Sequence, residues 1–64
     1  MEIYSCVKII NNKYLLDGVK IGDIGYIIES YDNNLYEVEF SDIKTGVSYA
    51  QIVVNLDDIE YVSQ

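Results

Sequence analysis

An all-β fold is predicted for this chain of 64 residues from three observations. Short segments rich in β-branched and aromatic residues recur along it, and clusters of Asn, Asp and Gly separate them. No proline interrupts any segment, and half of the residues are hydrophobic, which is typical of a globular chain rather than a disordered one. A chain of this length forms one domain, residues 1–64, with a single small core.

The first part of the chain predicts a strand followed by a long loop. Residues 3–10 (IYSCVKII) have the composition and the near alternation of a strand. The next residues carry the turn signals Asn-Asn, Asp-Gly and Gly-Asp, so they are expected to form a loop. Leu15, Leu16 and Val19 are expected to pack from this loop over the core.

The middle of the chain predicts a β-hairpin. Strands are expected at 24–31 and 35–40, joined by Asp32-Asn33-Asn34. A three-residue hairpin loop usually ends in a left-handed residue, and Asn34 suits that position. The loop therefore fixes which residues of the two strands face each other.

This register sorts the hairpin side chains between two faces. The expected pairs are Tyr31 with Leu35, Ser30 with Tyr36, Glu29 with Glu37, Ile28 with Val38, Ile27 with Glu39, and Tyr26 with Phe40. The face predicted to be buried holds Ile24, Tyr26, Ile28, Tyr36, Val38 and Phe40. The face predicted to be exposed holds Ile27, Glu29, Tyr31, Leu35, Glu37 and Glu39.

The last part of the chain completes the predicted fold. The segment VSYAQIVV, residues 47–54, predicts a fourth strand. Asn55 is suited to cap one helical turn whose first positions carry Asp57 and Asp58, and 59–62 predicts a short fifth strand. Five short strands, a long first loop and one helical turn before the last strand describe a small SH3-like β-barrel.

Two motifs carry a resemblance to a known family. Residues 20–29 read KIGDIGYIIE, and residues 36–40 read YEVEF. In this the chain resembles a group of short bacterial domains of unknown function, whose core reads K-x-G-D-x-G-x-[VI]-[VI]-E followed by Y-E-V-E-F. The resemblance covers roughly residues 14–62, and it implies the SH3-like barrel without implying an activity.

The charge balance excludes several classes of function. The chain has eleven Asp and Glu residues and four Lys, with no Arg and no His, and its formal net charge is −7. Nucleic-acid binding needs Lys and Arg to neutralise phosphates, so it is not expected. Binding to an anionic membrane is not expected for the same reason. A basic protein would be attracted instead.

Catalysis is not expected either, and no cofactor or metal is predicted. Without His there is no imidazole base, and Cys6 has no activating partner near it in sequence. The glycines have no Walker spacing and are expected in turns and close approaches. A single cysteine forms no internal disulfide, and residues 1–10 do not have the pattern of a signal peptide, so a cytoplasmic location is expected.

The exposed face of the hairpin is the candidate protein-binding site. Ile27, Tyr31 and Leu35 would supply apolar anchors among Glu29, Glu37 and Glu39, a mixture suited to a basic partner. Other interpretations remain open: the glutamates simply splay into solvent, they bind a divalent cation, or they act as an acid–base pair. The acidic end formed by Asp57, Asp58 and Glu60 is a rival surface.

The sequence thus predicts a non-enzymatic, acidic protein-binding module. Its expected role is that of an inhibitor that covers a basic toxin or nuclease, such as an immunity protein, an antitoxin or a phage anti-defence protein. The alternative is a structural or accessory barrel that forms a homo-oligomer or docks on a larger enzyme. A binder of a small ligand is a third possibility.

Overall fold

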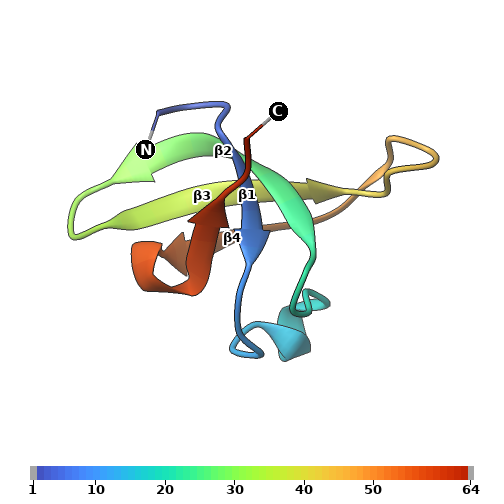
Figure 1. Ribbon diagram of the computed structural model, residues 1–64, viewed down its shortest axis with the longest axis horizontal. Helices are drawn as coiled ribbons and strands as arrows, with labels where there is room; N and C mark the ends of the chain where they lie inside the picture. Colours follow the sequence, from blue (N-terminus) through green and yellow to red (C-terminus); the bar gives the residue numbers. More distant parts are fainter. Residues whose placement is uncertain (1, 64) are drawn as a thin grey trace.

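The computed structural model describes residues 2–63, and its strands form one antiparallel sheet (Figure 1). The elements in chain order are β1 (Cys6–Ile9), the 3-10 turn η1 (Leu15–Asp17), β2 (Ile24–Tyr31), β3 (Leu35–Ser41), β4 (Ser48–Asn55), the 3-10 turn η2 (Leu56–Asp58) and β5 (Ile59–Tyr61). The predicted all-β class is therefore confirmed.

The strand order is β4-β3-β2-β1-β5. Strands β2, β3 and β4 form a meander, and β1 pairs with both β2 and β5, so the first and last strands are neighbours. The sheet curls strongly, with the β2–β3 turn and the β3–β4 loop at opposite ends of the molecule (Figure 1). The five short strands, the hairpin and the one helical turn before the last strand thus follow in the predicted order.

The first strand is shorter than predicted. It spans Cys6–Ile9 rather than 3–10, because Tyr4 has a φ of 69° in the left-handed region and turns the chain before the strand begins. At the other end, the N–H of Ile10 donates to the carbonyl of Asp58, which belongs to the turn η2 and not to β5, so the strand ends at Ile9. Composition alone does not reveal either boundary.

The predicted packing of the long loop is only partly right. Val19 is fully buried, but Leu15 and Leu16 are exposed at η1. Tyr14 packs against the core in their place. The turn η1 is a single 3-10 turn, and none of its residues is buried.

The hairpin follows the predicted register for its first half. Asn34 has a φ of 61°, which confirms its left-handed conformation, and Asn33 also has a positive φ of 64°. The pairs Tyr31 with Leu35, Ser30 with Tyr36, and Glu29 with Glu37 form as expected.

Beyond Glu29 the register shifts at a β-bulge. Val38 pairs with Ile27 rather than with Ile28, and Glu39 pairs with Tyr26. One extra residue on β2 reverses the faces of the side chains that lie on the far side of the bulge from the hairpin turn. The predicted exposure of Ile27 and the predicted burial of Tyr26 are therefore both wrong: Ile27 is 0% exposed and Tyr26 is 43% exposed.

Gly25 lets β2 lie close to β3 beyond the bulge. A Cβ atom at this position would lie 2.7 Å from the carbonyl oxygen of Glu39 and 2.7 Å from the side chain of Val38. These contacts are closer than any side chain tolerates, so only glycine fits here. The expectation that this glycine marks a close approach is confirmed.

The core lies on the inner face of the curled sheet. Its buried side chains come from all five strands and from the long loop, and they are Val7, Ile9, Val19, Ile27, Tyr36, Val38, Phe40, Val54 and Ile59. Tyr14, Ala50, Ile52 and Leu56 pack against them from the edges. A small core of this kind leaves a narrow margin of stability.

We expect Ile27→Ala to lower the free energy of unfolding by about 2–5 kcal/mol, because it opens a cavity in the core. The matched control is Ile43→Ala, since Ile43 is 90% exposed and its truncation changes stability by about 0.5 kcal/mol or less. Urea unfolding monitored by circular dichroism measures both. Equal stability of the two variants would mean that Ile27 faces solvent.

Candidate functional site

The outer face of β2, β3 and β4 carries most of the predicted site. We call it the acidic sheet face, and by the observed pairing it consists of Tyr26, Glu29, Tyr31, Leu35, Glu37 and Glu39, with Gln51 and Val53 contributed by β4. Every predicted site residue except Ile27 lies on it. The bulge puts Tyr26 in the place expected for Ile27, so the surface has a second tyrosine instead of an isoleucine.

Glu37 lies at the centre of this face and is held by both neighbouring strands. The Tyr31 hydroxyl donates to its Oε1, and the Gln51 amide donates to its Oε2. The hydrogen bonds from Tyr31 and Gln51 lower the pKa of the Glu37 carboxyl below its ordinary value. The hydrogen bond between Tyr31 and Glu37 raises the pKa of the Tyr31 hydroxyl. Glu37 is therefore ionised at neutral pH and has a fixed orientation.

The other two glutamates add unneutralised charge around Glu37. Glu29 lies directly opposite Glu37 on β2, and Glu39 lies two residues further along β3. Like charges placed opposite each other across a strand pair destabilise the sheet. Among residues 2–63, no three side chains of the metal-ligating types come together.

None of the ion pairs found among the described residues involves this face. Lys8 pairs with Glu60 at 3.7 Å, Lys13 with Asp58 at 3.3 Å, and Lys20 with Asp23 at 3.0 Å. The fourth lysine, Lys44, lines a pocket in the β3–β4 loop region. None of these lysines is paired with Glu29, Glu37 or Glu39, so the acidic sheet face keeps its negative charge.

The rival acidic end is used largely inside the protein. Asp58 is 5% exposed, and it accepts hydrogen bonds from Asn11 Nδ2 at 2.7 Å, Tyr14 Oη at 2.6 Å and Lys13 Nζ at 3.3 Å. Together these contacts fasten the long first loop to η2. Asn55 accepts from the N–H of Asp57, which confirms the predicted cap.

The surroundings of Asp58 shift its ionisation. Burial by itself raises the pKa of this carboxyl, but the hydrogen bonds from Tyr14 and Asn11 and the Lys13 ammonium outweigh it and hold the pKa below its ordinary value. Burial, with Asp58 beside it, raises the pKa of the Tyr14 hydroxyl. The cluster is a structural attachment, and of the rival acidic end only Asp57 and Glu60 remain exposed.

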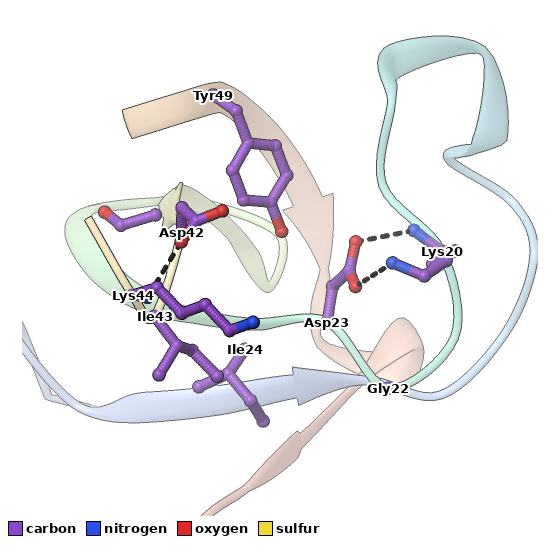
Figure 2. Close-up of a pocket in the computed structure, with 9 residues that line it drawn as sticks. Lys20, Gly22, Asp23, Ile24, Asp42, Ile43, Lys44 and Tyr49 are labelled. Carbon is purple, nitrogen blue, oxygen red and sulfur yellow. Dashed lines mark hydrogen bonds and ion pairs between the residues drawn. The ribbon is translucent and has the colours of Figure 1, made fainter. Parts of the chain in front are cut away.

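A pocket that sequence reasoning missed lies at the other end of the sheet. It has a volume of about 380 Å³ and is lined by Lys20, Gly22, Asp23, Ile24, Ser41, Asp42, Ile43, Lys44 and Tyr49. Figure 2 shows Asp23 turned toward Lys20, with the Tyr49 hydroxyl directed to the same carboxylate. The Lys20-Ile-Gly-Asp23 motif was a signal for this turn, but only the fold brings the β3–β4 loop against it.

The carboxylates of the pocket already accept hydrogen bonds from other groups of the protein. Asp23 accepts from the backbone N–H of Lys20 and from its ammonium, each at 3.0 Å. Burial raises the pKa of Asp23, and the two Lys20 contacts outweigh this and lower it. Asp42 accepts from the N–H of Lys44 at 2.8 Å and of Thr45 at 3.1 Å. These hydrogen bonds hold the turn before β2 and the β3–β4 loop in shape. The carboxylates that line the pocket therefore stabilise these two loops.

The remaining features offer little chemistry. The thiol of Cys6 is free and buried. Within the described residues, no helix is long and apolar enough to cross a membrane.

Comparison with known proteins identifies a family. The sequence model of the family described as Domain of unknown function (DUF4926) matches residues 5–61. The resemblance to short domains of unknown function is thereby confirmed, and it extends further toward the amino terminus than the motifs indicated. No curated protein and no solved structure matches the chain significantly.

Replacing Asp58 tests the role of the buried cluster. Asp58→Asn removes a charged acceptor from three hydrogen bonds, and a hydrogen bond to a charged group contributes about 1.5–3 kcal/mol to stability. We therefore expect a lower melting temperature at pH 7 than for Asp57→Asn, the matched control at an exposed neighbour.

The difference between the two variants should depend on pH in a defined direction. Because the folded pKa of Asp58 is lowered, its contribution is complete above the unfolded pKa of about 3.9 and is lost as the pH falls through the folded pKa. Thermal melts between neutral and strongly acidic pH measure this. A constant difference between the variants across that range would contradict the role given to Asp58.

Proposed function

We propose that this chain, which belongs to the DUF4926 family, is a non-enzymatic protein-binding module whose acidic sheet face covers a basic partner protein. The observation that carries the proposal is the unneutralised charge of Glu29, Glu37 and Glu39. Three of the four lysines pair with other carboxylates, and the fourth lines the pocket at the β3–β4 loop.

The composition of the face supports binding to a protein. Tyr26 is 43% exposed and Tyr31 is 44% exposed, so aromatic rings stand beside the glutamates. Tyrosine is enriched in protein interfaces because it combines a large apolar surface with a polar end. Acidic groups around such anchors give specificity for a basic partner and accelerate its association.

The fixed geometry of Glu37 supports the same function. Its two oxygens are oriented by Tyr31 and Gln51 before any partner arrives. A carboxylate that is already oriented loses less conformational freedom on binding a Lys or Arg side chain. Such a group is suited to meet a cationic surface.

Inhibition is the role that these properties favour. A nuclease or a similar toxin uses a cationic groove to hold phosphates, and a small protein with a net charge of −7 can occupy such a groove. An immunity protein, an antitoxin and a phage anti-defence protein would all use this chemistry. No catalysis, nucleic-acid binding or membrane binding is proposed.

An accessory or self-associating barrel is the second candidate. Strand β4 lies at an edge of the sheet, and an exposed strand edge is able to pair with another strand. This observation favours an assembly of some kind, whether with a second copy or with a larger enzyme.

Charge reversal on the face tests the proposed function. A variant with Glu37→Lys and Glu39→Lys, immobilised in parallel with the original protein, is exposed to native extract at about 0.15 M salt, where the Debye length is about 8 Å. The original protein should retain one basic protein in a stoichiometric amount, and the variant should not. The association rate constant of the variant with that basic protein should be lower than that of the original protein by about tenfold or more, since electrostatic steering is lost.

The matched control carries Asp17→Lys and Asp57→Lys, which change the net charge equally at exposed positions of the turns η1 and η2, outside the acidic sheet face. It should retain the partner. Circular dichroism melts of both variants check that each is folded. If the stoichiometric partner is acidic or neutral, or if the Glu37 and Glu39 variant retains it as well as the control does, the proposed function is wrong.

A further inference from the structure

Strand β4 is an edge strand that carries no charged residue and no proline, and the one register shift in its pairing with β3, between Phe40 and Ser41, lies at the end away from Val53. It spans Ser48–Asn55, and β3 is its only neighbour within the described part of the chain. Between Lys44 and Asp57 the sequence has no charged residue and no proline, and this is the longest uncharged run of the chain. Natural sheets block their edges with short strands, charges, prolines or bulges. The opposite edge, β5, is short and contains Glu60.

The ladder shows which groups of β4 face outward. The N–H of Leu56 donates to the carbonyl of Asn34, and antiparallel pairs alternate between hydrogen-bonded and non-hydrogen-bonded pairs. Ala50, Ile52 and Val54 therefore bond to β3. Gln51, Val53 and Asn55 direct their N–H and C=O groups away from it.

One of these outward amides is already occupied. The N–H of Asn55 donates to the Tyr14 hydroxyl at 3.1 Å, which is consistent with the assigned direction. Tyr14 is held in turn by Asp58 at 2.6 Å. The end of the edge is thus closed by the first loop, whereas the segment around Gln51 and Val53 is covered by no other strand of the described residues.

The open segment borders the acidic sheet face. Val53 lies directly opposite Glu37 on β3, and Gln51 lies directly opposite Glu39. Directly opposite residues point to the same face of a sheet. A strand added beside β4 would therefore direct every second side chain onto the acidic sheet face, about 10 Å from β3 at two strand spacings. Arg and Lys are long enough to approach the glutamates from there.

We propose that β4 receives an extended segment of the basic partner as an added antiparallel strand, with Arg or Lys at alternate positions above Glu37 and Glu39. This inference rests on the proposed function and adds the binding mode and the pattern of the bound segment. Backbone hydrogen bonds to Gln51 and Val53 supply affinity, and the acidic sheet face selects the side chains. A second copy of this chain fits less well, because pairing β4 with β4 would place two acidic faces side by side.

The probe is an acetylated and amidated heptapeptide in which Val and Arg alternate, with Val at both ends. It is titrated into the full chain labelled with ¹⁵N, and amide hydrogen exchange is followed by NMR. Exchange at Gln51 and Val53 should slow by about tenfold or more, since hydrogen-bonded amides are protected. Asn55, already bonded to Tyr14, and Ile52, bonded to β3, should change little.

Two pairs of reagents test the strand geometry. Val53→Pro removes one outward N–H at a position where an edge strand tolerates proline, and Val53→Thr is its matched control. In the peptide, methylation of the Arg amides blocks the groups that face β4, and methylation of the Val amides does not. Val53→Pro and Arg methylation should each weaken binding by about tenfold or more, the change expected for lost backbone hydrogen bonds.

The outcomes separate this inference from the proposed function. If the Arg peptide binds equally well after Val53→Pro and after Arg methylation, strand addition is wrong and the acidic sheet face still binds cations. If a peptide with Glu in place of Arg binds as well as the Arg peptide, the basic occupant and the proposed function are both wrong. Failure of the Arg peptide to bind overturns the inference. The inference is also wrong if the amides of Gln51 and Val53 become protected from exchange without peptide as the protein concentration rises, because β4 then pairs with a second copy. Should Val53→Pro fail to fold, the methylated peptides decide.

Discussion

The β-bulge between Ile27 and Glu29 determines what each face of this sheet contains. Without it, the alternation of β2 would put Tyr26 and Ile28 inside and Ile27 outside. With it, Ile27 packs in the core opposite Val38, and Tyr26 lies beside Glu39 on the outside. One additional residue thus supplies the core with a fully buried isoleucine and the acidic sheet face with an exposed tyrosine.

Contacts on both sides of β2 hold the shifted register. Gly25 allows β2 to approach the carbonyl of Glu39 and the side chain of Val38 more closely than any other residue permits. The carbonyl and the N–H of Ile27 are taken by Tyr4 and Ser5 from the segment before β1. The shifted register is therefore held from both sides, by β3 and by the amino-terminal segment.

Local signals predicted most of the fold, and the errors arose where long-range contacts decide. The Asp32-Asn33-Asn34 loop, the strand bounds at Ile24 and Tyr31 and the Asn55 cap all depend on neighbours in sequence, and they were predicted correctly. The bulge was missed because Ile27 and Ile28 are equally apolar, so both registers bury an isoleucine. The exposure of Leu15 and Leu16 was missed because Tyr14, through its bond to Asp58, takes the place over the core.

The candidate site followed the same division. The glutamates and Tyr31 were placed correctly because they lie near the hairpin turn, on the loop side of the bulge or on β3 itself. The pocket beside Lys20 was missed because it joins loops that are distant in the sequence. The outward amides of β4 were missed too, because the strand order of the complete sheet determines which strand is left at the edge.

The position of Ile27 opposite Val38 is the feature on which both the core and the acidic sheet face depend, and proton NMR measures it directly. The N–H of Ile27 donates to Ser5 and not to β3, so Ile27 and Val38 form a non-hydrogen-bonded pair with Cα atoms about 4.5 Å apart. A strong nuclear Overhauser effect between the Hα protons of Ile27 and Val38 is therefore expected. A strong effect between the Hα protons of Ile28 and Val38 instead would place Ile27 among the glutamates and remove Tyr26 from the acidic sheet face.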